Sequence, residues 1–174
     1  LKQGRDIRVF NVFDSLKPST IKIVKQSGYN MIKVDAEHFL HNPETLNNFL
    51  VMARDNELSP AVTIPTVSRP MVSTLLDAGA QGICLAHSDT LDQVEELVKW
   101  MKYPPIGERA LAPGSNAEYI IDDPLFHCEN ENKVTLLILK IESRKGVENA
   151  ESLLSNEWVD AIIFGPGDLA ADMG

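Results

Sequence analysis

The sequence has little cysteine and lacks any long apolar run. Two cysteines, Cys84 and Cys128, occur among 174 residues, which is too few for a disulfide framework and indicates reduced thiols in a cytoplasmic protein. The longest apolar runs, such as Leu136–Leu139 and Ala161–Phe164, are far too short to cross a bilayer, so we expect no membrane partner. The N-terminus has no basic region followed by a long apolar stretch, so we expect no secretory signal.

Positive charge is also scarce. The chain has 16 Lys and Arg against 25 Asp and Glu, and its formal net charge is −9. Because nucleic acid phosphates bind to clustered Lys and Arg, this balance argues against nucleic acid as a partner. It does not exclude a small anionic substrate, since one or two placed cations or a metal ion can hold such a ligand.

No repeat, low-complexity tract or linker divides the chain, so we expect a single domain over residues 1–174. Short β-rich runs alternate in it with amphipathic stretches. Most of the β-rich runs are almost continuously apolar, as parallel strands buried on both faces are. The six expected strands are Ile7–Phe13, Met31–Ala36, Ala61–Ile64, Gly82–His87, Thr135–Ile141 and Ala161–Phe164.

Apolar residues at helical spacing fill the intervals between these strands. One such helix opens with Asn42 as its N-cap, and another follows Ser88 or Asp89. Gly28 and Gly79 are suited to end helices in the left-handed conformation. Strands that alternate with helices predict βαβ units and a parallel sheet.

The sheet is open and doubly wound or closed into a barrel, and two features favour the barrel. No Gly-rich turn follows the first strand, which disfavours a dinucleotide-binding fold. Polar residues recur just after strand ends, as on the active face of a barrel; they are Glu37–His38, His87–Ser88, Glu142–Ser143 and Gly165–Asp168. We therefore predict an α/β fold, a (β/α)₈ TIM barrel truncated after the sixth strand, because a complete barrel usually needs at least about 200 residues.

Two carboxylates are the first candidates for chemistry. Alternation along the fifth strand places Lys140 and Glu142 on one face, and Asp168 follows an open Gly-Pro-Gly turn that can bind an anion. A salt bridge at the rim explains Glu142 equally well, and a helix N-cap explains Asp168. Together they lie at corresponding ends of neighbouring strands and suit a hard divalent ion, Mg²⁺ or Mn²⁺, that a 2-oxo acid can chelate.

Two histidines also follow strands. His38 is suited to acid–base work, because its unperturbed pKa is about 6.5 and a neighbouring carboxylate would orient its ring. From spacing alone, a histidine that is merely hydrogen-bonded at the start of a loop explains it as well. His87, at the end of the fourth strand, is a further candidate to line the pocket.

Five segments together resemble the HpcH/HpaI aldolase/citrate lyase family, in its 2-oxo-3-deoxy acid aldolase branch. They occur in the family's order along the whole chain, as Val34–His38, Leu75–Ala80, Lys102–Arg109, Ile141–Glu142, and Phe164–Leu169 with Asp172–Gly174. The resemblance implies a barrel, usually a homohexamer, that uses Mg²⁺, Mn²⁺ or a similar ion such as Co²⁺. By this likeness Glu142 and Asp168 match the metal ligands, and His38 matches the general base. Asp77 matches an acid that raises the basicity of the histidine, and the backbone of Gly167 and Asp168 matches the pyruvate-binding turn.

The chain departs from the family pattern at the substrate site. The family's Arg at the end of the third strand is replaced by Thr63, and a Gln two residues before the metal-binding Glu is replaced by Lys140. We hypothesise that Lys140 supplies the lost cation, with Arg69 as a second candidate. Asp77 ends a helix that runs away from the active face, so it would act across a subunit interface or simply bond its own turn. Asp35 is then the nearer carboxylate for His38.

The resemblance implies a metal-dependent (class II) pyruvate aldolase, which cleaves a 4-hydroxy-2-oxo acid reversibly to pyruvate and an aldehyde. A rival enzyme mechanism is Schiff-base catalysis by Lys140 or Lys33, because a lysine in a dry barrel can lose its proton. A rival from another class is a non-catalytic scaffold, since a barrel without two strands leaves open sheet edges.

Overall fold

The computed structural model describes residues 6–174 as one curled sheet with helices on its outer side. The strands are β1 Val9–Val12, β2 Met31–Asp35, β3 Ser59–Ile64, β4 Gly82–Leu85, β5 Leu136–Ile141 and β6 Val159–Phe164. The helices are α1 Pro18–Gln26, α2 Pro43–Asp55, α3 Arg69–Asp77, α4 Leu91–Met101, the 3₁₀ turn η1 Ser115–Ala117, α5 Pro124–Val134, α6 Arg144–Glu148, α7 Ala150–Leu154 and α8 Pro166–Met173.

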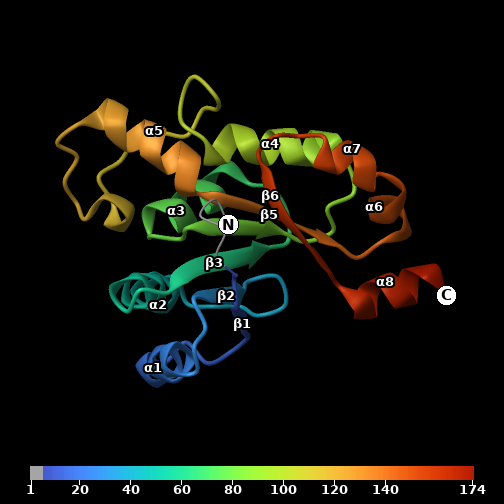
Figure 1. The fold of residues 1–174 in the computed structure, drawn as a ribbon, viewed down its shortest axis with the longest axis horizontal. Helices are drawn as coiled ribbons and strands as arrows, with labels where there is room; N and C mark the ends of the chain where they lie inside the picture. The colour runs from blue at the N-terminus through green and yellow to red at the C-terminus, as the bar shows by residue number, and fades with distance from the viewer. Residues whose placement is uncertain (1–5) are drawn as a thin grey trace.

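The six strands are all parallel and follow one another across the sheet in the order β1-β2-β3-β4-β5-β6. Figure 1 shows α1 and α2 along one side of the curled sheet and α4, α5 and α7 along the other. This is a half-barrel, with the arrangement of the first six strands of a (β/α)₈ barrel, so the predicted fold class is confirmed. That residues 1–174 form one barrel domain without its last two units stays a prediction.

Side chains alternate between two layers along each strand. On the inner side of the curl, Met31, Ala61, Cys84 and Ile138 pack into one small cluster. On the outer side, the strands pack against the helices in two larger clusters, one under α3 and α4 and one under α1 and α2. Both cysteines are free thiols, and burial raises the pKa of each, Cys84 being the more deeply buried.

Local signals set several helix ends as expected. Asn42 caps α2, where its side chain accepts a hydrogen bond from the N–H of Thr45 at 3.1 Å, and Gly28 and Gly79 have φ of 81° and 102°. The cap of α4 is Thr90 rather than Ser88 or Asp89, because Thr90 and Gln93 form a reciprocal capping box. The sequence pattern did not indicate α5, because its eleven residues are largely polar and form no apolar stripe.

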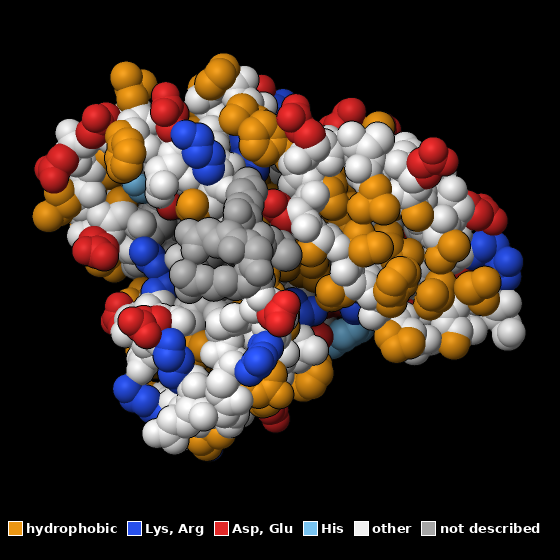
Figure 2. Space-filling view, viewed as in Figure 1, with side chains coloured by type: hydrophobic (Ala, Val, Ile, Leu, Met, Phe, Trp, Pro, Cys, Tyr) orange, Lys and Arg blue, Asp and Glu red, His pale blue; other side chains and the backbone are white. Residues whose placement is uncertain are grey.

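The outermost strands each have one open edge, since β1 pairs only with β2 and β6 only with β5 among the described residues. Apolar side chains are exposed there; Phe13 beyond β1 is 50% exposed and Phe164 in β6 is 61% exposed. Figure 2 shows hydrophobic side chains gathered on the right-hand half of the face, where Figure 1 places β6 and α8. In residues 6–174 no helix has both the length and the apolar composition that a membrane span requires.

Candidate active site

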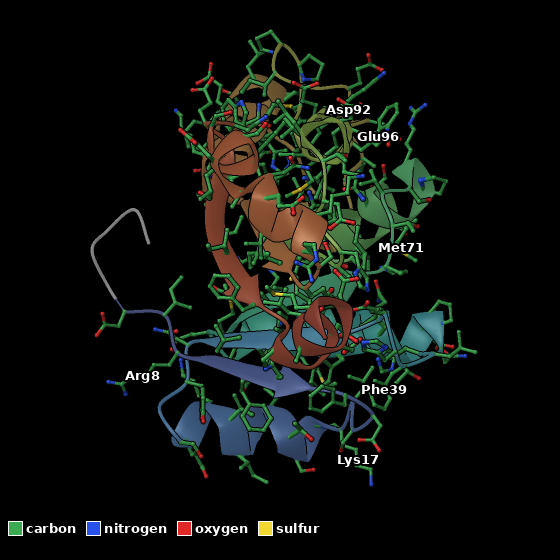
Figure 3. The ribbon with its side chains drawn as sticks, turned by 90° about the vertical axis from the view of Figure 1, so that its right-hand side faces the viewer. Arg8, Lys17, Phe39, Met71, Asp92 and Glu96 are labelled. Atoms are coloured by element: carbon green, nitrogen blue, oxygen red, sulfur yellow. The ribbon has the colours of Figure 1, made fainter. Side chains whose placement is uncertain are left out.

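A pocket of about 410 Å³ runs along the inner side of the curled sheet as far as residues beyond the carboxyl ends of the strands. Figure 3 shows α8 lying in front of the sheet on this side of the molecule. The walls come from β1, β2, β3, β5 and β6 and from the turn before α8, so five strands far apart in sequence contribute to one cavity. Of the residues expected at the site, those that line this pocket are Asp35, His38, Thr63, Lys140, Gly167 and Asp168.

Glu142 follows the last residue of β5 and is 1% exposed. The backbone N–H of His87 donates to its Oε1 at 2.9 Å, and Nζ of Lys140 lies 2.6 Å from its Oε2. The side chain lies against Gly165, where an added Cβ would collide with both Oε2 and Cβ of Glu142. A glycine is therefore required at 165, and this close approach brings the turn before α8 next to the carboxylate.

Lys140 bridges two carboxylates on the inner side of the sheet. Its Nζ donates to Oε2 of Glu37 at 3.0 Å as well as contacting Glu142, and its side chain is only 14% exposed. Burial lowers the pKa of Lys140, but the contacts with Glu142 and Glu37 outweigh that effect and raise the pKa above its ordinary value. Lys140 is therefore an ammonium at neutral pH, which disfavours Schiff-base catalysis by this lysine, because that mechanism needs a free amine.

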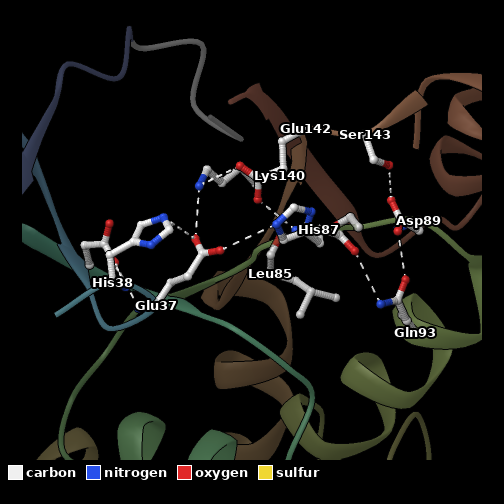
Figure 4. Close-up of polar contacts among 11 residues, drawn as sticks. Glu37, His38, Leu85, His87, Asp89, Gln93, Lys140, Glu142 and Ser143 are labelled. Carbon is white, nitrogen blue, oxygen red and sulfur yellow. Dashed lines mark hydrogen bonds and ion pairs between the residues drawn. The ribbon is translucent and has the colours of Figure 1, made fainter. Parts of the chain in front are cut away.

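Glu37 is the centre of the polar contacts drawn in Figure 4. Besides Lys140, it faces two imidazoles: Nε2 of His38 lies 3.5 Å from its Oε2, and Nε2 of His87 lies 3.9 Å from its Oε1. We expected Asp35 beside the ring of His38, but Oδ1 of Asp35 instead accepts the backbone N–H groups of Glu37 and His38, each at 2.9 Å. Asp35 thus shapes the turn, and Glu37 is the carboxylate that contacts the His38 ring.

His87 occupies a left-handed backbone conformation with φ of 43° directly after β4 and Ala86. Its N–H is bound by Glu142 and its carbonyl accepts from Nε2 of Gln93 at 3.3 Å, which holds the turn in place. The ring then points to Glu37. Glu37, His87 and Glu142 each offer one potential metal-ligand atom, and these atoms lie within 4.8 Å of one another.

Asp168 lies in the first turn of α8, three residues after Gly165, which is the N-cap. It is therefore not the helix cap that its sequence context also allowed. Its side chain is exposed, and an added Cβ at Gly167 would meet nothing within 4 Å, so the turn is open toward the pocket. The first-turn N–H groups of Gly167 and Asp168 have no intrahelical partner, as is general at a helix N-terminus, and are suited to bind an anion.

Three further expected residues have different surroundings. Thr63 is 2% exposed and forms part of the pocket wall from β3. Arg69 lies over the ring of Trp100 at 5.1 Å, which directs it to the outer helices and not to the pocket. Asp77 ends α3, before β4 begins, and contacts Arg109 at 3.0 Å, so it sits at the opposite end of the strands from His38.

Comparison with known proteins identifies the family that the chain resembles in sequence and fold. Residues 12–174 match a family model described as HpcH/HpaI aldolase/citrate lyase. The chain is 28% identical over 158 residues to the hydroxypyruvate/pyruvate aldolase of Roseovarius nubinhibens, covering 90% of this chain and 61% of that relative. It is 28% identical over 157 residues to the 5-keto-4-deoxy-D-glucarate aldolase of Salmonella arizonae, with the same two coverages.

A solved structure resembles the fold of this chain over nearly the whole length of this chain. The HpcH/HpaI aldolase from Desulfitobacterium hafniense superposes with a TM-score of 0.95 at 29% identity, covering 99% of this chain and 67% of that one. The chain thus spans about three fifths of the length of the curated relatives it matches.

Proposed function

Because the chain belongs to the HpcH/HpaI aldolase/citrate lyase family, we propose that it carries the active face of a divalent-metal-dependent pyruvate aldolase. The observation that carries the proposal is the buried carboxylate of Glu142 packed against Gly165, at the start of the turn that holds Asp168 over an open pocket. The proposed reaction cleaves a 4-hydroxy-2-oxo acid to pyruvate and an aldehyde, and condensation is its reverse. Both relatives described above are named as aldolases.

The donor set fits a hard divalent ion, Mg²⁺, Mn²⁺ or Co²⁺. Glu142 is buried, a carboxylate oxygen of Glu37 lies within 4.8 Å of one of its own, and the absence of a Cβ at Gly165 leaves room for its side chain. Glu142 and Asp168 are the proposed ligands. An ion bound there would act as a Lewis acid on the keto group and stabilise the negative charge that develops on its oxygen.

His38 is the proposed base. Its Nε2 faces Glu37, so Nδ1 is the nitrogen left to accept the proton of the substrate's 4-hydroxyl. As that proton leaves, the C3–C4 bond breaks, the aldehyde departs, and the electron pair passes into the C2–C3 bond. Reprotonation at C3 then yields pyruvate. Whether a homo-oligomer, a hexamer by resemblance, brings Asp77 of one subunit to His38 of another stays a prediction.

The assay that tests this function measures pyruvate release from a panel of 4-hydroxy-2-oxo acids with purified full-length protein. The names of the relatives suggest that the panel include 5-keto-4-deoxy-D-glucarate and, for condensation, hydroxypyruvate and pyruvate with small aldehydes. We expect activity with Mg²⁺ or Mn²⁺, its loss in EDTA and its return when the ion is restored. Borohydride with pyruvate should trap no imine on the metal-dependent route, whereas the Schiff-base alternative through Lys140 or Lys33 predicts a trapped imine.

The same assay tests His38 with one variant, His38→Gln, and one control, His127→Gln. His38→Gln should lower kcat at least about a hundredfold, since general acid–base catalysis typically contributes that much. His127→Gln removes an imidazole from α5, far from the strand ends, and should leave kcat unchanged. If neither EDTA nor His38→Gln affects pyruvate release, the proposed mechanism is wrong, and if no substrate is cleaved at all, the scaffold alternative stands.

A second lysine is better placed than Lys140 to hold the substrate carboxylate. Lys33 lines the pocket from the middle of β2 and makes no salt bridge to any carboxylate of residues 6–174, whereas the charge of Lys140 is neutralised by two. We expect Lys33→Met to raise the KM for the 2-oxo acid by about tenfold to a hundredfold, the usual effect of losing a charged hydrogen bond, with a smaller change in kcat. Lys25→Met, which removes an exposed pair with Glu57, is the control. An unchanged KM in Lys33→Met, or an equal rise in Lys25→Met, contradicts this role.

A further inference from the structure

Three ligand-type side chains converge just beyond the ends of β2, β4 and β5. Carboxylate oxygens of Glu37 and Glu142 and a ring nitrogen of His87 lie within 4.8 Å of one another. The side chains of both carboxylates are largely buried, with 9% of Glu37 and none of Glu142 exposed. Two carboxylate oxygens and one imidazole nitrogen form a donor set that binds divalent ions.

A cation already lies at this cluster. Oε2 of Glu142 is buried and accepts no hydrogen bond of normal geometry from residues 6–174, yet Nζ of Lys140 lies 2.6 Å from it. The same ammonium donates to Oε2 of Glu37 at 3.0 Å (Figure 4). The two carboxylates thus hold a positive charge supplied by the chain itself, at the position where a divalent ion would share them.

The backbone conformation of His87 positions its side chain at this cluster. Its N–H binds Oε1 of Glu142 while its ring faces Glu37, so one residue contacts both carboxylates. The left-handed φ of 43° is uncommon for a residue other than glycine and is maintained by these contacts and by Gln93. This conformation places Nε2 beside the two oxygens.

We propose that the Glu37–His87–Glu142 cluster is an exchangeable cation site, in which Lys140 is the occupant of the metal-free protein and a divalent ion enters by displacing it. The proposal rests on the proposed function only for the presence of a divalent ion. Glu37 and His87 then bind the ion in addition to the Glu142–Asp168 pair of the proposed function; Asp168 itself is not part of the cluster. Imidazole binds Co²⁺ and Zn²⁺ more strongly than it binds Mg²⁺, so the site prefers Co²⁺ and Zn²⁺ to Mg²⁺. The displaced ammonium of Lys140 is released toward the pocket that it lines.

The first test measures Mn²⁺ affinity by calorimetry on the full-length protein without substrate. Lys140→Gln removes the competing charge but keeps a hydrogen-bond donor, so Mn²⁺ should bind about tenfold tighter or more, as expected when a close charge pair no longer has to be broken. Lys99→Gln, which removes an exposed lysine paired with Glu108, should leave the affinity unchanged. Unchanged or weaker Mn²⁺ binding in folded Lys140→Gln overturns the proposal.

The second test compares the binding of different divalent ions in protein that retains Lys140. His87→Gln should weaken Co²⁺ binding several times more than Mg²⁺ binding and should change the visible absorption spectrum of bound Co²⁺. In the wild type, titration with Zn²⁺ should shift the side-chain ammonium resonance of Lys140. Equal losses of affinity for Co²⁺ and Mg²⁺, or a Lys140 resonance that does not shift when Zn²⁺ is added, would overturn the proposal. If a divalent ion displaces Lys140 but no pyruvate is released, only the proposed function is refuted. If pyruvate is released but the Lys140 resonance does not shift when the ion binds, only the displacement of Lys140 is refuted.

Discussion

Glu142→Gln should abolish tight binding of a divalent ion and lower kcat/KM for pyruvate release by about a thousandfold, the size of effect seen when one electrostatic stabiliser of a transition state is removed. The substitution removes the charge from a carboxylate that is 1% exposed. Whichever way the amide turns, its NH₂ group meets a donor, either the N–H of His87 at 2.9 Å or the ammonium of Lys140 at 2.6 Å. The variant therefore also loses one of these two contacts, with His87 or with Lys140.

The measurement compares Mn²⁺ affinity, pyruvate release and thermal unfolding in Glu142→Gln and in a control, Glu44→Gln. Glu44 lies in the exposed first turn of α2, so its substitution should change stability by at most a few tenths of a kcal/mol and leave activity unchanged. Full metal affinity and turnover in folded Glu142→Gln would remove Glu142 from the site. Loss of activity in both variants would indicate a general effect of charge.

The strands and the location of the site follow from local signals. Runs such as Leu136–Ile141 are apolar because strands of a parallel sheet are covered on both faces, so their positions were predictable to within about two residues. Parallel strands also carry their carboxyl ends to one edge, which places His38 and Asp168 in the same pocket although 130 residues separate them in number. Alternation along β5 correctly placed Lys140 and Glu142 on the inner face.

The contacts within the site were not predictable in the same way. Lys140 and Glu37 are 103 positions apart, and their hydrogen bond depends on strand register and side-chain reach that no local pattern encodes. The role of Glu37 was missed for this reason, although its place beside His38 at a strand end was a usable signal. Arg69 was assigned by nearness in sequence to the third strand, but its helix turns it outward onto Trp100. Nearness in sequence therefore identifies the edge of the sheet at which a residue lies, but not the side chains that it contacts.

Gly165 and Gly167 lie in the same turn but differ in the space available for a Cβ, so substituting each in turn tests whether close packing against Glu142 matters. Gly165 is buried against Glu142, and a Cβ there would overlap Oε2 and Cβ of that residue. Gly167, two residues later, has no atom within 4 Å of such a Cβ. Neither residue has positive φ, so an alanine at either position is permitted by its backbone and differs from the other only in the space around it.

Gly165→Ala should therefore destabilise the protein by about 3 kcal/mol, the upper part of the usual cost of overpacking, because the obstructing atoms belong to a buried side chain that is itself held by two contacts. If the fold tolerates the change, Glu142 must move away from the turn, and Mn²⁺ affinity should fall with it. Gly167→Ala should change stability by less than about 0.5 kcal/mol and leave Mn²⁺ affinity intact. Denaturant unfolding with a parallel Mn²⁺ titration measures both effects. Equal behaviour of the two variants would mean that Glu142 does not depend on the turn, and the proposed metal-binding pair would then lose its structural support.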